Sequence, residues 1–198
     1  MNNDAELAPG ALASAGAALS AHPEAGSLAM SLRFLDRPGV LSSTGLAVFG
    51  DGSARDRDLG RPVDEGPRAV SPVAGACGGA AVWRREVLDR VGALGEEFFL
   101  YSEGVDIDLR AQRAGYACLY VPDAVVLHRF GASVARVPAA WRIELAHRNS
   151  ARVLVRNFGT LALARGVITF ALRGQRREIR RLGPDHRVDR WVERAGQP

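Results

Sequence analysis

The sequence VDIDLRAQRAGYACLYVPDAVVLH (residues 105–128) contains a helix pattern followed directly by strand patterns. We expect a helix over residues 105–114, because acidic residues open this segment and Gly115 ends it. Two short apolar strands should follow, with Pro122-Asp123 as the break between them: residues 116–121 and 124–127. A helix that leads straight into strands, in a chain without a visible internal repeat, predicts the α/β class.

The rest of the chain also mixes helix-like and strand-like segments. Helices are expected over residues 8–21 (with Pro9 in the first turn), 84–91 (ended by Gly92) and 138–157. Strands are expected over residues 28–35 and 44–49. Residues 51–72 are rich in Gly, Pro, Asp and Arg, which predicts a long surface loop that is either mobile or functional.

Length and composition indicate one soluble globular domain. The chain has 198 residues, of which 47% are hydrophobic and 24% charged, so disorder is not expected as its main state. No run reaches the roughly 18 apolar residues that a membrane-spanning helix needs. The acidic and amide residues at positions 2–6 are unlike a signal peptide, so we expect a cytoplasmic protein.

The charge is unevenly distributed. From Arg142 to the C-terminus there are 13 arginines and 5 acidic residues, whereas the preceding part has 13 arginines and 17 acidic residues. Residues 161–181 join an apolar half to five arginines between Arg173 and Arg181, which suits a helix lying on an anionic membrane surface. Nucleic-acid binding is not expected, because no aromatic residues interleave with the arginines and no known module is present.

The two cysteines, Cys77 and Cys118, form no CxxC pair, and Cys118 lies in an apolar, strand-like stretch. A disulfide framework or a zinc site is therefore not expected. We interpret both residues as buried free thiols.

An acidic turn and a histidine are candidates for cation binding. Asp4 and Glu6 flank one residue, and this spacing suits Mg²⁺ or Mn²⁺ bridging a diphosphate. Alternatively, both acids only favour the positive end of the following helix. His128 ends the apolar run 125–127 and is either a further ligand or a structural hydrogen-bonding residue.

A second group of candidates stands at the start of the helix over residues 105–114. Glu103 and Asp106 follow the pair Phe98-Phe99, and a carboxylate here suits a general base. The alternative is that these acids, with Asp108, only complement the helix dipole.

Gly75, Gly78 and Gly79 form a glycine-rich stretch without the Lys-Ser/Thr pair of a P-loop. These glycines either let the backbone approach a sugar or make a tight bend against the core. Arg148 either binds a phosphate or lies on a solvated helix face.

Taken together, these stretches resemble the second half of a family 2 glycosyltransferase of the rhamnosyltransferase-like branch. Residues 2–7 match the family's Asn-Asn-Asp-x-Glu-Leu turn without a gap, and residues 122–128 match its strand that ends in histidine. The segment between them matches at Glu96, Phe98, Phe99, Tyr101, Glu103, Asp106, Leu109 and Arg110. The resemblance runs from Asn2 to about Phe158 and implies part of a GT-A fold, the nucleotide-diphospho-sugar transferase fold.

The resemblance also implies roles for the candidate residues. The implied ligands of Mn²⁺ or Mg²⁺ are Asp4, Glu6 and His128. The implied substrate-binding residues are Gly75, Gly78, Gly79 and Arg148. The sequence departs from the family at Gly95, where the family has Asp, and at Gly104, where it has the presumed base. Because glycine cannot accept a proton, Glu103 or Asp106 would have to be the catalytic residue.

The family further implies how the chain is organised. Residues 1–158 would be the C-terminal part of a GT-A domain, and residues 159–198 a basic, amphipathic helical tail. Family members bind the nucleotide chiefly with strands that precede the acidic turn, a half that we expect to be missing from this sequence. The implied function is inverting transfer from a nucleotide-diphospho-sugar to a cell-envelope glycan or lipid-linked acceptor, impaired by this truncation, with peripheral membrane contact through the tail. The alternative is a non-catalytic fragment or partner subunit derived from a glycosyltransferase.

Overall fold

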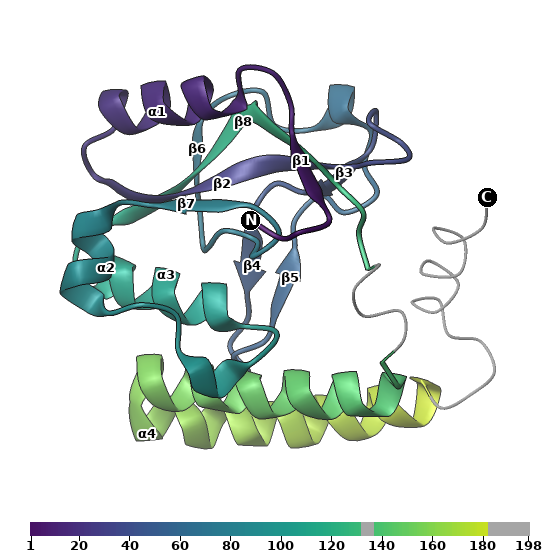
Figure 1. The fold of residues 1–198 in the computed structure, drawn as a ribbon. Helices are drawn as coiled ribbons and strands as arrows, with labels where there is room; N and C mark the ends of the chain where they lie inside the picture. Colours follow the sequence, from purple (N-terminus) through teal and green to yellow (C-terminus); the bar gives the residue numbers. More distant parts are fainter. Residues whose placement is uncertain (132–136, 182–198) are drawn as a thin grey trace.

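The computed structural model describes residues 1–131 and 137–181, which form a mixed α/β structure (Figure 1). This confirms the predicted α/β class. In chain order the elements are β1 (Ala5–Leu7), α1 (Ala11–Ala21), β2 (Ala25–Phe34), β3 (Leu41–Ser43), β4 (Leu46–Val48), β5 (Ala54–Asp56), η1 (Val63–Glu65), β6 (Ser71–Val73), β7 (Ala81–Trp83), α2 (Arg85–Val91), η2 (Glu96–Phe98), α3 (Glu103–Arg113), β8 (Ala117–His128) and α4 (Ala139–Arg181).

The centre of the structure is the parallel pair β2 and β8. Every residue of β2 except Arg33 is buried, as expected for a strand covered on both faces. Within the described residues, the main sheet has six strands in the order β1-β8-β2-β3, with β6 added to β8 and β7 added to β2. These four outer strands all run antiparallel to the central pair. Strands β4 and β5 form a separate antiparallel hairpin.

Helix α1 covers one face of the sheet (Figure 1). Its buried residues are alanines spaced at helical intervals, Ala11, Ala15 and Ala18, and they pack in one core cluster with Leu28, Met30 and Leu32 of β2. Alanine side chains let the helix approach the strands closely. Pro9 and Gly10 precede the helix rather than forming its first turn.

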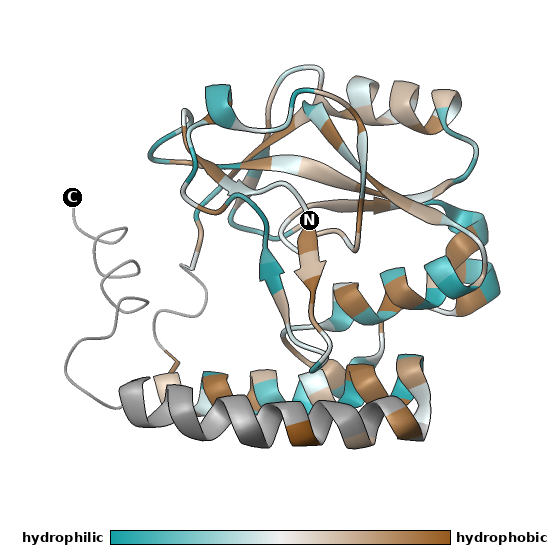
Figure 2. Cartoon of the chain, turned by 180° about the vertical axis from the view of Figure 1, so that it is seen from behind, coloured by the Kyte–Doolittle hydropathy of each residue, from teal (hydrophilic) through white to brown (hydrophobic). Residues whose placement is uncertain are grey.

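Helices α2 and α3 lie on the other side of the sheet, and α4 packs beyond α3 (Figure 1). Hydrophilic and hydrophobic residues alternate along α3, as Figure 2 shows, and two of its acidic residues, Asp106 and Asp108, are buried.

The two strands expected over residues 116–121 and 124–127 are one continuous strand, β8. Pro122 and Asp123 do not end it. Instead, the pairing with β2 jumps from Met30↔Val121 to Ser31↔Val125, so that the extra residues are absorbed at an irregularity. Proline is tolerated there because a bulge does not require its missing N–H.

Two further expectations are modified by the structure. The strand expected over residues 44–49 is present but shorter, as β4, because the chain bends at Gly45 between β3 and β4. Residues 51–72 are not an unstructured loop, because they contain β5, η1 and the start of β6. These short strands lack the apolar alternation by which a strand is recognised in sequence.

Helix α4 is interrupted at Gly159, whose φ of 75° and ψ of 176° are not helical. The part after Gly159 runs back toward the side of the molecule from which α4 starts (Figure 1). The predicted basic tail begins here, and its last residues, 182–198, lie outside the described part of the chain. Among the residues that the structure describes, no helix is long and apolar enough to cross a membrane.

Gly26 is the position where the packing of β2 tolerates no side chain. A Cβ atom added there would lie 2.6 Å from Cβ of Tyr116 and 2.9 Å from Cγ2 of Val87. We predict that Gly26→Ala lowers the free energy of unfolding by about 1–3 kcal/mol, as overpacking does elsewhere. Urea denaturation would measure the change.

Gly16→Ala is the matched control, because a Cβ atom at this α1 position would meet nothing within 4 Å. It should raise the free energy of unfolding by about 0.5–1 kcal/mol through helix propensity. Equal effects of the two variants would contradict the packing argument.

Candidate active site

The glycine-rich stretch lies where the three predicted site segments meet. The N–H of Asn2 donates to the carbonyl oxygen of Gly79 at 3.0 Å, which ties the acidic turn to this stretch. A Cβ atom at Gly79 would lie 3.2 Å from Cε1 of His128, and one at Gly78 would lie 2.9 Å from Oε1 of Glu103. Neighbouring glycines therefore contact the predicted cation site and the predicted base.

Glu103 is the first residue of α3, and its carboxylate lies against Gly78. Its Oε2 atom is buried and has no hydrogen-bond partner among the described residues. A Cβ atom at Gly104 would lie 3.2 Å from the Ala76 carbonyl oxygen and 3.9 Å from the Gly78 nitrogen. A side chain at position 104 would therefore face the same glycine-rich stretch that the Glu103 carboxylate already contacts.

The backbone just before Glu103 is strained. Phe99, Tyr101 and Ser102 have φ angles of 60°, 68° and 70°, a region that residues with a Cβ atom rarely adopt. Such residues cost about 1–3 kcal/mol each and persist only where the surroundings hold them.

Asn149 of α4 is the side chain that holds this segment. It is fully buried, and its Nδ2 donates to the carbonyl oxygens of Phe98, Leu100 and Tyr101 at 2.8, 2.7 and 2.8 Å. We assigned Asn149 no role from the sequence. The available signal was its spacing of four residues from Leu145 and Val153, which places a polar residue in a buried helix stripe.

Asp106 lies in the interface between α3 and α4, where it contacts Arg156 and Asn157 of α4. Its side chain is fully buried, and its oxygens pair with Arg110 at 2.9 Å and Arg156 at 3.4 Å. Asn157 donates a hydrogen bond to it at 2.9 Å. Because these partners occupy the carboxylate, the environment of Asp106 is that of a structural anchor, and Glu103 is the better placed proton acceptor.

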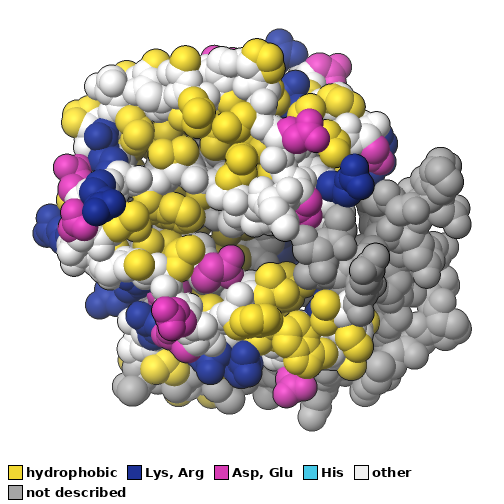
Figure 3. All heavy atoms as spheres, in the orientation of Figure 1, with side chains coloured by type: hydrophobic (Ala, Val, Ile, Leu, Met, Phe, Trp, Pro, Cys, Tyr) yellow, Lys and Arg dark blue, Asp and Glu magenta, His cyan; other side chains and the backbone are white. Residues whose placement is uncertain are grey.

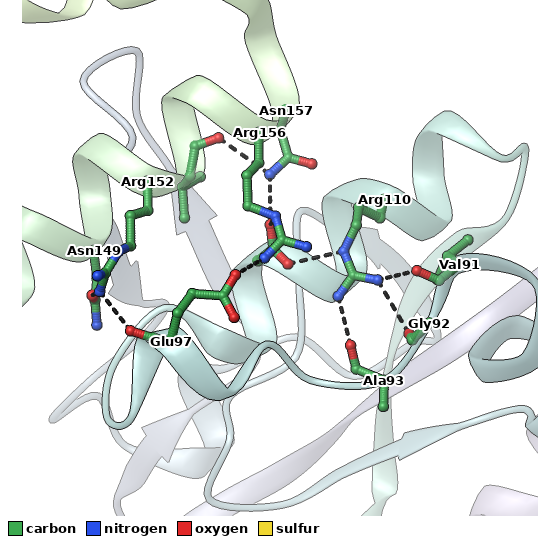
Figure 4. A network of polar contacts seen from close by, with 11 residues as sticks. Val91, Gly92, Ala93, Glu97, Arg110, Asn149, Arg152, Arg156 and Asn157 are labelled. Atoms are coloured by element: carbon green, nitrogen blue, oxygen red, sulfur yellow. Dashed lines mark hydrogen bonds and ion pairs between the residues drawn. The ribbon is translucent and has the colours of Figure 1, made fainter.

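Further contacts in Figure 4 extend this anchor on both sides. Arg110 also donates to the carbonyl oxygens of Val91, Gly92 and Ala93, which fixes the segment after α2. Arg156 also pairs with Glu97. Side chains of α3 and α4 thus hold the segment between α2 and α3 in place.

Asp108 holds the glycine-rich stretch from the side of α3 that faces the sheet. Its Oδ2 accepts a hydrogen bond from the N–H of Ala76 at 2.6 Å, and its Oδ1 accepts one from Nε1 of Trp83 at 2.8 Å. Burial raises the pKa of Asp108 above its ordinary value, although these hydrogen bonds oppose the shift. The sequence indicates only a helix-terminal charge for Asp108. It cannot indicate these contacts, because Ala76 and Trp83 are distant from Asp108 in sequence.

Asp4 and His128, two of the three predicted cation ligands, lie beside each other. Oδ1 of Asp4 lies 3.3 Å from Nε2 of His128, and both side chains are largely buried. Strand pairing explains the contact, because Ala5 is opposite His128 in the β1–β8 ladder. Glu6 is exposed and is opposite Leu127, so it does not join the pair. In residues 1–131 and 137–181, no three His, Cys, Asp or Glu side chains are grouped closely enough to hold a metal ion.

Asp56 of β5 is a neighbour of this pair that the sequence did not predict. Burial raises its pKa, while Ser43, Cys77 and the charge of His128 oppose the shift. Burial likewise raises the pKa of the Cys77 thiol, and that of Cys118. Both cysteines are free, as predicted, but only Cys118 is buried, and Cys77 is half-buried.

Arg148 is exposed on α4, where it lines a small hollow with Trp141, Glu144 and Leu145. Trp141 exposes 41% of its surface and meets the ring of Phe99, itself 79% exposed, edge to face at 6.2 Å between centroids. Trp141 is thus exposed, whereas Leu145 and Val153 of the same helix are buried.

The contacts of Asn149 predict its effect on stability. Asn149→Ala should lower the free energy of unfolding by about 2–3 kcal/mol, because it leaves buried carbonyl groups unpaired. Urea denaturation measures this loss, and faster hydrogen exchange at residues 98–103 would locate it. Ser150→Ala is the control and should change stability by less than about 0.5 kcal/mol, since its hydroxyl bonds only within α4. Similar effects of both variants would contradict the role given to Asn149.

The raised pKa of Asp108 predicts a pH dependence. The folded state holds this proton more tightly than the unfolded state, so Asp108 makes stability fall as the pH rises above about 3.9 toward its folded pKa. Asp108→Asn removes this dependence. The free energy of unfolding of the variant, relative to the wild type, should therefore increase as urea denaturation is repeated from pH 4 to pH 7. A constant or decreasing difference would contradict the prediction, and Asp89→Asn controls for the loss of an exposed acid.

Comparison with known proteins gives a partial match. No family model matches the chain. It is similar to the N-acetylglucosaminyl-diphospho-decaprenol L-rhamnosyltransferases of two Mycobacterium tuberculosis strains, CDC 1551 / Oshkosh and ATCC 25618 / H37Rv, with 39% identity over 69 residues in each case. The match spans 35% of this chain and 22% of the length of each relative. This partial identity supports a relationship to a glycosyltransferase family.

Proposed function

We propose that this chain takes part in inverting transfer of a sugar from a nucleotide-diphospho-sugar to a lipid-linked glycan acceptor of the cell envelope. The observation that carries the proposal is the meeting of Glu103 and His128 at adjacent glycines, Gly78 and Gly79. The partial identity to enzymes named as rhamnosyltransferases acting on a diphospho-decaprenol supports the same chemistry.

Glu103 is the proposed general base. Its Oε2 atom, which has no hydrogen-bond partner among the described residues, would accept the proton of the acceptor hydroxyl. As that proton leaves, the hydroxyl oxygen forms its bond to the anomeric carbon, and the bond to the nucleoside diphosphate breaks on the opposite face. Asn149 contributes by holding the strained segment that sets the position of Glu103.

Asp4 and His128 are the proposed ligands of Mn²⁺ or Mg²⁺. A carboxylate oxygen and an imidazole nitrogen facing each other at 3.3 Å fit such an ion, for which a bound diphosphate and water would complete the coordination. The ion would neutralise the charge that develops on the departing diphosphate. Glu6 would join the site only if its exposed side chain turned toward the pair.

The surroundings suit the proposed substrates. Gly75, Gly78 and Gly79 present backbone without side chains, which allows a sugar to approach closely. Hydrophobic side chains gather over the start of α4 on the face seen in Figure 3. Phe99 and Trp141, whose rings meet edge to face, are both exposed. This apolar surface, with Arg148 beside it, would contact the lipid and diphosphate of the acceptor at the membrane.

A transfer assay with matched variants tests the proposal. The donor would be nucleoside-diphosphate L-rhamnose, and the acceptor a polyprenyl-diphospho-N-acetylglucosamine, with Mn²⁺ present. We expect Glu103→Gln to lower turnover about 10²–10⁴-fold while nucleotide binding changes less than about twofold. Glu96→Gln is the control, because Glu96 is exposed on the same segment and should leave turnover unchanged.

Two results would overturn parts of the proposal. If Glu103→Gln kept at least half of the turnover, another residue would be the base. If the wild-type chain transferred no sugar and bound neither Mn²⁺ nor a nucleoside diphosphate, the non-catalytic alternative would replace the proposal. Binding that is lost in Asp4→Ala and His128→Ala would support the cation site independently of turnover.

A further inference from the structure

A cavity of about 250 Å³ lies away from the candidate active site. It is an open hollow between β2 and β8 on one side and residues 63–68 on the other, and it shares no lining residue with the Glu103 or His128 sites. Ser31 and Arg33 line it and alternate along β2 with Met30 and Leu32, which pack toward α1. The cavity therefore opens on the sheet face opposite α1.

The floor of this cavity carries polar groups that can make further hydrogen bonds. The Tyr120 hydroxyl donates to the Ser31 hydroxyl at 3.1 Å, and both residues are almost fully buried. Arg33 also lines the cavity, and its Nε has no hydrogen-bond partner among the described residues, so the protein does not use the full donor capacity of this guanidinium.

The rim carries charges of both signs. Asp64 and Asp123 are exposed there beside Arg68, whose Nη2 donates to the Asp64 carbonyl oxygen at 2.7 Å. Asp123 reaches this rim because the irregularity in β8 adds residues between Val121 and Val125. Two carboxylates offset two arginines, so the cavity does not select an anion as a purely basic pocket would.

We propose that this cavity binds a single sugar unit of a glycan. A sugar hydroxyl both donates and accepts, so one ring can accept from Arg33 and donate to Asp123, while Leu41 and Pro67 contact its apolar face. The volume is below the roughly 300–1,000 Å³ of pockets that enclose drug-sized ligands, which suits one ring rather than a nucleotide-sugar. The site gives a role to the segment 51–72 beyond its strands, and it does not depend on transferase activity.

Ligand-observed saturation-transfer NMR on the full chain tests this site. The probes are methyl α-L-rhamnoside and methyl N-acetyl-β-glucosaminide, with inorganic phosphate as the competing anion. We expect saturation transfer to at least one sugar, and about tenfold weaker binding for Arg33→Met, equivalent to the loss of one charged hydrogen bond. Asp123→Asn should weaken binding about threefold or more.

Matched controls separate the site from the rest of the surface. Arg85→Met and Asp89→Asn change an exposed pair on α2 and should leave sugar binding unchanged. Thermal melting shows whether Arg33→Met is folded. If Arg33→Met does not fold, Asp123→Asn still tests the site, because Asp123 is exposed. The proposal is overturned if neither sugar binds, if Asp123→Asn and a folded Arg33→Met bind as tightly as the wild type, or if phosphate alone binds with dependence on Arg33.

Discussion

The buried carboxylate of Asp106 is the constraint on which the arrangement of the two long helices depends. An ionised carboxylate in the interior costs several kcal/mol unless new partners replace its water. Arg110, Arg156 and Asn157 are those partners, and two of them belong to α4. The register of α4 on α3 is therefore set by charge. Asn149 lies eight residues before Asn157 on the same buried stripe, so this register also brings it to the strained segment.

Asp108 makes the corresponding attachment on the other side of α3. At 100° per residue, positions 106 and 108 point in nearly opposite directions, one toward α4 and the other toward the sheet. Asp108 binds the backbone of Ala76 and the indole of Trp83, so the glycine-rich stretch is attached to α3. Glu103 stands at the start of this helix. Its position against Gly78 is thus a consequence of two buried acids that take no part in the proposed chemistry.

The sequence predicted the elements whose signals are local. Helices α2 and α3 begin and end within two residues of the expected positions, because Gly92 and Gly115 end them. Strand β8 was predicted as two strands, because a proline normally ends one, and only its pairing with β2 reveals the irregularity. The short strands β5 and β6 were missed for a similar reason. Their pairing partners lie in β4 and β8, and their own residues carry no alternating pattern.

By itself, the sequence determined the α/β class and the candidate acids, because residue type and spacing carry that information. The grouping of Asp4 with His128 was an implication of the resemblance to a glycosyltransferase family, and no strand was expected at Ala5. Only the tertiary structure decided the environment of each acidic residue, and with it the role that the residue can have. Glu103, Asp106 and Asp108 lie within six residues and look alike in sequence, yet one faces the glycines, one is buried in an ion-pair network, and one binds backbone. The environment of a carboxylate is made by residues from other elements, and no local pattern encodes them.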